Sequence, residues 1–403
     1  MSQVKLLAAP LLGMLLSPTV LHAQSADKPA ITPYADIRYR LEVVDQDGLP
    51  EDATASTLRV KIGAKTGAWH GLSALVEGEA IMRVGPRHYN DTVNGLARYP
   101  VVADPSDVLL NQAYIRFQPS ETVDAVAGRQ VINLDNQRWI GSVGWRQNDQ
   151  TFDAAKVAVT PVAGVTAQYF HSWRVNRIFG PDSPRGIWHD ASVDAGNVSV
   201  KLGKAGTLTG YGYWLDIPEA PAASSRTIGA RMAGRPAVAS TITLLYSAEY
   251  ARQTDLSPNP ANFGLDYVAL EAGIAAKGFT VKGGYERLEG NGTVALQTPL
   301  ATLHAFNGWA DVFLNTPANG LRDLYADASY KVAAGPLKGL LLRGAYHDFR
   351  STVGDLGYGQ EFDALIAYPV TKQIGVSAKF AHYNSDGFAT DRTKAWFSIE
   401  AKF

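Results

Sequence analysis

The chain has 403 residues, and its 37 Lys and Arg against 38 Asp and Glu give a formal net charge of −1. So small a net charge provides no global field that would attract nucleic acid or a strongly acidic partner. The chain has no cysteine, which excludes disulfides, thiolate metal sites and a cysteine nucleophile, and suits a protein that crosses an oxidising periplasm unfolded.

The first 23 residues are typical of a secretory signal peptide. Lys5 supplies a positive charge, residues 6–16 form a short apolar run, and Ala23 offers a small residue at the cleavage point. The alternative is an N-terminal anchor helix, which the shortness of the run disfavours. We therefore predict a signal peptide at 1–23 and one mature domain at 24–403.

No long apolar run follows the signal peptide, although 46% of the residues are hydrophobic and the mean hydropathy is −0.09. The apolar residues are therefore dispersed along the chain. Dispersed hydrophobicity with a period of two residues is typical of transmembrane β-barrels, which show no long apolar segment.

The first predicted strands show this period clearly. Residues 37–43 place apolar and charged side chains on opposite faces, with Ile37, Tyr39, Leu41 and Val43 on one face and Asp36, Arg38, Arg40 and Glu42 on the other. Residues 57–65 and 72–83 repeat the pattern. Each segment is therefore expected to be a strand with one apolar and one polar face.

Further strands are expected along the rest of the chain. In order, they span 111–117, 125–132, 151–157, 165–178, 191–202, 207–217, 226–232, 239–253, 266–275, 279–288, 322–332, 340–350, 361–369, 374–384 and 393–403. The connections between them are alternately long and short, and the longest are 85–109 and 289–320. About 18 strands, long extracellular loops and short periplasmic turns are the pattern of an antiparallel bacterial outer-membrane β-barrel.

The last predicted strand adds a separate signal. Its apolar face alternates up to Phe403, and a terminal aromatic residue on such a strand is typical of the segment that barrel assembly machinery recognises. The alternative is an ordinary edge strand that ends in Phe by chance. We expect the chain to lie in the bacterial outer membrane, surrounded by lipid and lipopolysaccharide, after transfer to the periplasm.

A barrel of about 18 strands has a lumen too wide for side chains to fill, so its inward positions should be polar. Basic residues gather on the polar faces of the early strands, namely Arg38, Arg40, Arg59, Lys61, Arg83, Arg116 and Arg129. Acidic residues share those faces, so we expect an arginine-rich sector of the lumen. Arginine offers a planar fork that suits carboxylates and sugar hydroxyls. The alternative is that each arginine pairs with an acid and stiffens the wall.

The stretch 128–157 joins two predicted strands through a cationic, aromatic loop. Its segments Gly128–Gln130, Asn136–Gly141, Gly144-Trp145 and Phe152-Asp153 resemble the pattern of the alginate-export family of outer-membrane barrels, as does the segment Leu303–Asp311. This resemblance implies a porin of about 18 strands with a cationic pore for an anionic polysaccharide.

The resemblance also implies roles for single residues. Arg129, Arg138 and Arg146 would be cations of the lumen or of the pore entrance, and Asp153 would be an inward partner of one of them. The sequence continues after Asp153 as Ala-Ala-Lys, which departs from the family pattern. Lys156 is therefore expected to supply one cation of that wall.

Asp311 and Arg322 would lie, by the same resemblance, around a loop folded toward the pore. We predict a channel for anionic or hydroxyl-rich saccharides, with no cofactor and no bound metal. A non-selective diffusion porin is an alternative, and so is a soluble periplasmic β-sandwich or β-helix protein. An outer-membrane barrel enzyme is a third alternative, but the sequence has no Gly-x-Ser-x-Gly elbow and no His-Glu-x-x-His zinc pattern.

Overall fold

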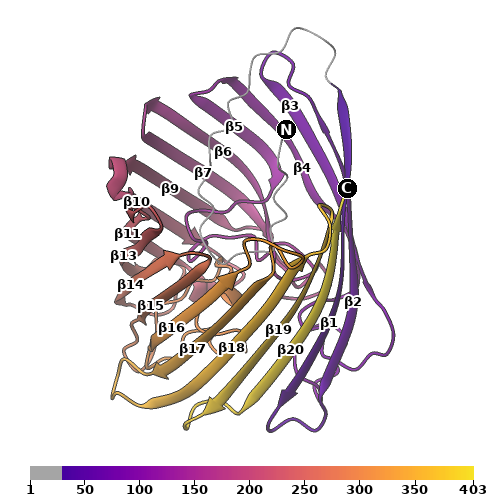
Figure 1. Cartoon of the computed structure of the whole chain (residues 1–403), viewed down its shortest axis with the longest axis vertical. Coiled ribbons are helices and arrows are strands. Elements are labelled where there is room, and N and C mark those ends of the chain that lie inside the picture. Colours follow the sequence, from indigo (N-terminus) through magenta and orange to yellow (C-terminus); the bar gives the residue numbers. More distant parts are fainter. Residues whose placement is uncertain (1–29) are drawn as a thin grey trace.

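The computed structural model describes residues 30–403, and the predicted signal peptide lies outside this range. Twenty strands of the described range form one antiparallel sheet. The sheet closes into a barrel because β1 (Ile31–Gln46) pairs with both β2 (Ala53–Thr66) and β20 (Arg392–Lys402). The cylinder of strands is evident in Figure 1.

Two of the twenty strands are short, β8 (Ile187–Trp188) and β12 (Ala237–Ala239), which leaves 18 that form the wall. The remaining wall strands are β3 (Leu72–Arg83), β4 (Asp107–Ser120), β5 (Val123–Gln130), β6 (Thr151–Val162), β7 (Val165–Asn176), β9 (Ser192–Lys201), β10 (Thr207–Asp216), β11 (Ser225–Gly234), β13 (Ile242–Asp255), β14 (Gly264–Ala276), β15 (Phe279–Leu288), β16 (Leu321–Lys331), β17 (Leu341–Arg350), β18 (Gly357–Pro369) and β19 (Ile374–Ser385). The predicted all-β antiparallel barrel of about 18 strands is confirmed.

The wall has an apolar outer face and a polar inner face. Residues directly opposite each other on neighbouring strands share a face, and successive residues alternate between faces. On the outer face, Val108 and Ile115 are 80% and 61% exposed. On the inner face, charged residues such as Arg40 and Glu42 are buried. A closed sheet also pairs every strand edge, as the hydrocarbon layer requires.

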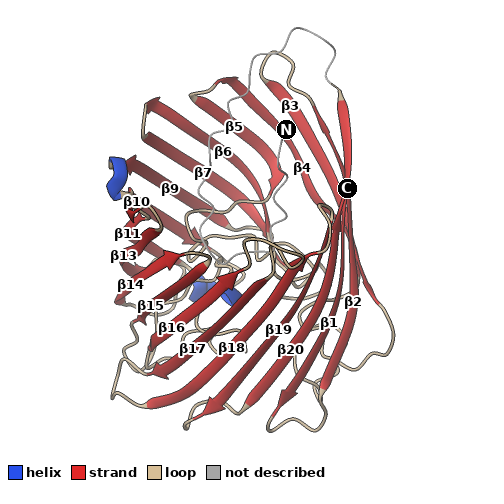
Figure 2. Ribbon diagram, viewed as in Figure 1, coloured by secondary structure: helices blue, strands red, loops and turns tan. Residues whose placement is uncertain are grey.

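One end of the barrel carries short turns, and the other carries the long connections 84–106, 131–150, 177–191 and 289–320. Three 3-10 turns, each of three residues, are the helical elements of the described range. None of these is long and apolar enough to cross a membrane. Figure 2 shows loops that cross the interior of the barrel.

Residues 131–150 and 289–320, which we name the inner loops, are packed inside the barrel. Trp139 and Ile140 of the first loop and Leu300 and Trp309 of the second belong to one buried apolar cluster together with wall residues. Loops usually run over the surface, because their backbone polar groups need partners. The polar contacts of the inner loops with the charged lumen wall therefore define the site.

Candidate functional site

The two inner loops are bonded to each other and form one unit. A parallel bridge joins Ile140 to Leu300, and the Gly141 amide donates to the Leu300 carbonyl over 2.9 Å. The Gln150 side-chain amide donates to the carbonyls of both Gly141 and Leu300, at 2.8 and 3.0 Å. A displacement of either loop would therefore break contacts of the other.

Four charged residues, Glu42, Arg146, Asp311 and Lys394, form a buried group that we name the Asp311 cluster. Arg146 of the first inner loop contacts Glu42 and Asp311 at 3.1 Å each. Lys394 of β20 lies 2.7 Å from Asp311 and 3.2 Å from Glu42. Two cations and two carboxylates thus balance one another where both inner loops meet the wall.

The ion pairs of the Asp311 cluster set the pKa values of its two loop residues, Arg146 and Asp311. Burial acts against the charge of Arg146, but Glu42, Asp104 and Asp311 raise its pKa above the usual value. Burial likewise would raise the pKa of Asp311, yet His304, Lys394 and Arg146 hold that pKa well below its usual range. Both loop residues are therefore charged at neutral pH.

His304 of the second inner loop is buried beside the Asp311 cluster. Its ring stacks on Trp145, with centroids 4.4 Å apart and an interplanar angle of 5°. Its Nδ1 lies 2.7 Å from Asp311 Oδ1, and its Nε2 lies 2.7 Å from Lys379 Nζ. A neutral imidazole satisfies both contacts, because Nδ1–H donates to the carboxylate and Nε2 accepts from the ammonium.

The ammonium of Lys379 lies in an aromatic environment at the same place. Its Nζ is 3.9 Å from the ring centroid of Trp145 and 3.8 Å from that of Trp309. Cation–π contacts at such distances stabilise a desolvated cation. Because Trp145 and Trp309 come from different inner loops, Lys379 of β19 holds both loops to the wall.

We expect acid to weaken this arrangement through His304. Burial lowers the pKa of His304 to about 3, whereas an unfolded histidine titrates near 6.5. The unfolded state therefore binds the extra proton first, so the stability contribution is complete above about pH 6.5 and is lost as pH falls toward 3. Between pH 7.5 and 4.5 the loss should be about 2–3 kcal/mol.

The measurement is the urea unfolding free energy at both pH values for the wild type and for His304→Gln. We expect the wild type to lose more stability on acidification than His304→Gln does. An exposed histidine, His70, provides the matched control, and His70→Gln should follow the wild type. Identical pH dependence in His304→Gln and the wild type would contradict the prediction.

The first inner loop has a second anchor across the lumen, at β13 to β15. Arg138 Nε donates to Glu286 over 2.6 Å, and its other nitrogens donate to Thr298 and Asn307 of the second inner loop. Trp139 Nε1 donates to Glu249 over 2.8 Å. Arg138 and Arg146 are thus buried in ion pairs that hold the loop, and neither is a free cation of the pore.

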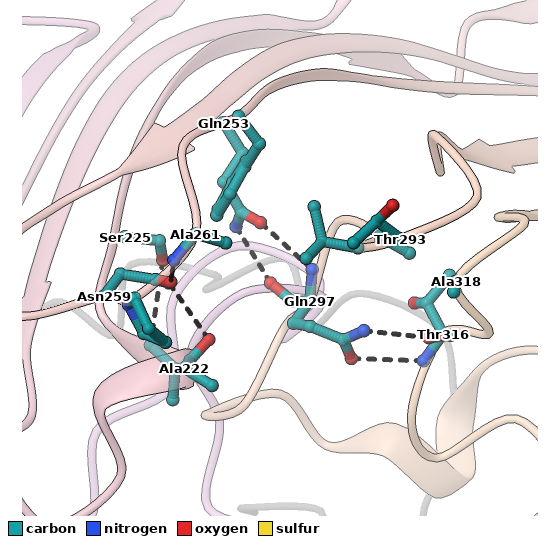
Figure 3. Close-up of a pocket in the computed structure, with 14 residues that line it drawn as sticks. Ala222, Ser225, Gln253, Asn259, Ala261, Thr293, Gln297, Thr316 and Ala318 are labelled. Atoms are coloured by element: carbon teal, nitrogen blue, oxygen red, sulfur yellow. Dashed lines mark hydrogen bonds between the residues drawn. The ribbon is translucent and has the colours of Figure 1, made fainter.

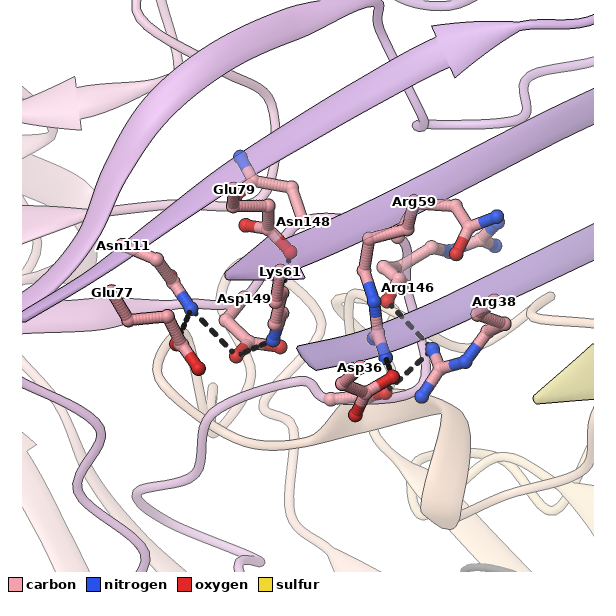
Figure 4. A network of polar contacts seen from close by, with 12 residues as sticks. Asp36, Arg38, Arg59, Lys61, Glu77, Glu79, Asn111, Arg146, Asn148 and Asp149 are labelled. Atoms are coloured by element: carbon pink, nitrogen blue, oxygen red, sulfur yellow. Dashed lines mark hydrogen bonds and ion pairs between the residues drawn. The ribbon is translucent and has the colours of Figure 1, made fainter. Parts of the chain in front are cut away.

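A third set of contacts joins the same loop to β1 to β4, as Figure 4 shows. The Lys61 ammonium pairs with Asp149 and lies 3.5 Å from Glu79. Arg38 donates to the backbone carbonyls of residues 144, 145 and 146 at 3.1, 3.3 and 3.2 Å. A guanidinium that binds three successive carbonyls fixes the path of the loop backbone.

The structure places six of the residues predicted to line the pore on the inner face of the wall, namely Arg38, Arg40, Arg59, Arg83, Arg116 and Lys156. Their surroundings differ. Arg40 is buried and lies 4.1 Å over the Trp145 ring, and Arg59 pairs with Asp36 at 2.6 Å. Arg116 and Lys156 are more exposed to solvent than Arg40 and Arg59.

The structure corrects the expected positions of three residues. Arg129 of β5 is directly opposite Ala113 of β4 and Asp153 of β6. Ala113 is on the same face of β4 as Ile115, which is exposed on the outside of the barrel. Arg129 and Asp153 therefore face outward, with a 2.6 Å ion pair. Arg322 also faces outward, on the same side of β16 as Leu324, which is 60% exposed. Strand parity is the reason, because Gly128 and Gln130 take the inward positions of β5.

Sequence reasoning missed several residues that meet the inner loops, including Lys379, Lys394, Glu249, Glu286 and Glu361. Glu361 of β18 accepts a hydrogen bond from the Ala310 amide over 2.6 Å. Each of these residues occupies an inward position of an alternating late strand, so the period-two pattern could have placed them in the lumen. It could not show which of them contact a loop.

A pocket of about 280 Å³ lies where the second inner loop leaves the wall, between residues 222–225, 259–263 and 293–297 (Figure 3). Its lining carries no charged side chain. The amides of Gln253 and Gln297 bond within the protein, since Gln297 N donates to Gln253 Oε1 and Gln297 Nε2 donates to the Thr316 carbonyl. The pocket is neutral, and its amides fasten the base of the loop.

Comparison with known proteins agrees with this geometry. A family model described as alginate export matches residues 34–176, which include β1 to β7 and the first inner loop. The resemblance to that family is therefore confirmed over this part of the chain. No curated relative matches.

Several solved structures share the fold over nearly the whole chain. Pseudomonas aeruginosa OpdO is 15% identical with a TM-score of 0.70, covering 93% of this chain and 97% of its own. P. aeruginosa OccK9 (OpdG) is 14% identical with a TM-score of 0.73, covering 93% and 98%. Acinetobacter baumannii OccAB4 is 13% identical with a TM-score of 0.71, covering 93% and 98%.

At these identities the likeness concerns the fold. That fold is the barrel of outer-membrane proteins such as the outer membrane protein OpdK of P. aeruginosa, which is 12% identical with a TM-score of 0.69, covering 92% of this chain and 98% of its own. The predicted location in the bacterial outer membrane agrees with this fold, because a closed barrel with an apolar outer face suits a bilayer.

Proposed function

We propose that this outer-membrane barrel, which matches the alginate export family over residues 34–176, is a channel whose inner loops select anionic or hydroxyl-rich saccharides. The observation that carries the proposal is the docking of both loops onto a charged lumen wall through buried ion pairs. Loops bonded to the wall at three places hold their groups in fixed positions, as selection among solutes requires.

Two accessible cations of the lumen wall support an anionic solute. Arg116 and Lys156 lie on the inner face of β4 and β6, on the side of the lumen where the short turns begin. Arg116 pairs with Asp124 at 2.6 Å and is 41% exposed, and within residues 30–403 no ion pair joins Lys156 to a carboxylate. Asp124 holds Arg116 through two hydrogen bonds, of 2.6 and 3.1 Å, so the exposed part of this guanidinium and the ammonium of Lys156 are the groups that would meet carboxylates or hydroxyl groups of a passing saccharide.

The test is the reversal potential in a planar bilayer with a salt gradient. We expect the wild type to prefer anions, and the double variant Arg116→Gln/Lys156→Gln to shift toward cations. Arg129→Gln removes an outward arginine and is the matched control, with wild-type selectivity expected. A cation-selective wild type, or a double variant with unchanged selectivity, would overturn the arginine-containing pore.

A second measurement separates selective from non-selective passage. Oligosaccharides of uronic acids should reduce the wild-type current at lower concentrations than neutral oligosaccharides of equal length. The double variant should reduce this difference. Equal effects of both sugars on the wild type would favour a general diffusion porin.

We also propose two partners outside the lumen. The β20 strand, with Phe403 beyond it, supplies an alternating apolar face of the kind that barrel assembly machinery binds. Lipopolysaccharide would contact the outer face of the wall at the long-loop end.

A further inference from the structure

Three outward arginines stand side by side at the long-loop end of the wall. Arg287 of β15 is directly opposite Arg322 of β16, which is directly opposite Arg350 of β17. We name these three residues the arginine row. Directly opposed like charges destabilise a sheet, so this arrangement needs anions nearby.

The arginine row lies at the edge of the apolar outer surface. Leu324 lies two residues after Arg322 along β16, toward the middle of the wall, and is exposed on the outer face. Tyr346 and Val281 on the neighbouring strands are exposed on the same face. Arginines just beyond the apolar band lie at the level of the lipid head groups. With the long loops outside the cell, that level belongs to the outer leaflet.

The carboxylates near the row leave many arginine donors unused. Arg287 donates to Glu289 over 2.7 Å, whereas Arg322 and Arg350 share Asp355. An arginine has five N–H donors, and each of these three makes one such bond to a carboxylate. The Nε of Arg322 is buried and has no partner, so the donors that remain for a ligand are on the terminal nitrogens.

The positions of these acids leave the membrane side of the row open. Glu289 and Asp355 lie in loops beyond the strand ends, away from the membrane. Asp348 lies on the membrane side, at 3.6 Å from Arg350 Nε. The next outward positions on the membrane side of Arg287 and Arg322 are Tyr285 and Leu324, which carry no carboxylate.

Other outward arginines each have a carboxylate that no second arginine shares. Arg129 holds Asp153 through two bonds of 2.6 and 2.9 Å and donates a third to the Leu110 carbonyl. Arg252 of β13 has its own carboxylate, Asp266, at 2.7 Å. The row differs from both, because two of its members share one exposed acid.

We propose that the arginine row binds the phosphate groups of lipopolysaccharide in the outer leaflet. A phosphate accepts two parallel N–H bonds from a guanidinium, so one or two phosphates would occupy the unused donors and relieve the repulsion along the row. This site is on the outer face of the wall and rests only on the outer-membrane location, so its test is independent of the solute that the channel passes.

The test uses the refolded barrel in detergent with EDTA and measures binding of lipid A carrying its phosphates and of the same lipid after dephosphorylation. We expect the wild type to bind the phosphorylated form at least tenfold more tightly. Arg287→Gln/Arg322→Gln/Arg350→Gln should remove this preference, and the single variant Arg322→Gln should reduce it. Heat-dependent gel migration establishes that each variant is folded.

Arg252→Gln and Arg129→Gln are matched controls, because each removes an outward arginine that has its own carboxylate, and both should bind like the wild type. Asp355→Asn removes the shared internal acid and should strengthen binding of the phosphorylated lipid. Equal binding of the two lipids by the wild type, or wild-type binding by the folded Arg322→Gln variant, would overturn the proposal. Binding that requires added Mg²⁺ would also overturn it, because the acids would then hold the lipid through the metal.

Discussion

Asp311→Asn is expected to detach the inner loops from the wall and to raise the single-channel conductance several-fold. Asp311 accepts from Arg146, Lys394 and His304, and its loss leaves buried cations without a full set of partners. Breaking a buried ion pair by removing one side costs about 3–5 kcal/mol. Asparagine keeps the shape and tolerates the positive φ of 61° at this residue, so the effect reports the charge.

The measurements are conductance in planar bilayers and the unfolding free energy in urea. Asp52, an exposed carboxylate in the β1–β2 loop, gives the matched control, and Asp52→Asn should change neither quantity. Wild-type conductance and stability in Asp311→Asn would show that the Asp311 cluster does not hold the loops.

Trp139→Ala is expected to lower the unfolding free energy by a similar amount, because Trp139 belongs to the anchor of the first inner loop on the opposite side of the lumen. Trp139 is buried, donates to Glu249, and packs edge-on against Tyr267 with centroids 5.1 Å apart. Removing a buried tryptophan costs about 3–5 kcal/mol. Glu249 would also lose one donor. We expect lower stability and a noisier, larger current as this end of the loop becomes free.

Trp69→Ala separates this effect from the loss of any tryptophan, because Trp69 is 57% exposed in a short turn. Trp139→Phe keeps the packing but not the N–H donor, and should have an intermediate unfolding free energy. A Trp139→Ala variant as stable as Trp69→Ala would show that the loop does not depend on this anchor.

The fold could be predicted from the sequence because it depends on the local alternation of apolar and polar residues. Residues 36–43 show both faces within eight positions, and the rhythm of long and short connections gives the strand number. The predicted strand ends are in error in both directions, since β4 begins at Asp107 and not at residue 111, whereas β7 ends at Asn176 and not at residue 178. Three of the four added residues of β4 are apolar, and Val108 and Leu110 continue its exposed outer face.

The site could be predicted less completely from the sequence, for two physical reasons. A shift of one residue exchanges the two faces of a strand, and this error placed Arg129 in the lumen, while the family resemblance implied the inward position of Asp153. The contacts of the inner loops are also distant in sequence, since Arg138 meets Glu286 and Arg146 meets Asp311. A pattern within the loop can indicate that Arg138 and Arg146 seek anions, but not which ones.

The Asp311 cluster also has a consequence for assembly. Glu42 belongs to β1 and Lys394 to β20, so the cluster straddles the seam at which the first and last strands meet. Arg38 and Glu400 pair across the same seam at 3.0 Å. The cluster can form only after closure, when both strands are in register. Completion of the cluster therefore follows closure and locks the seam, and lateral opening of the finished barrel must first separate Glu42 from the two buried cations, Arg146 and Lys394.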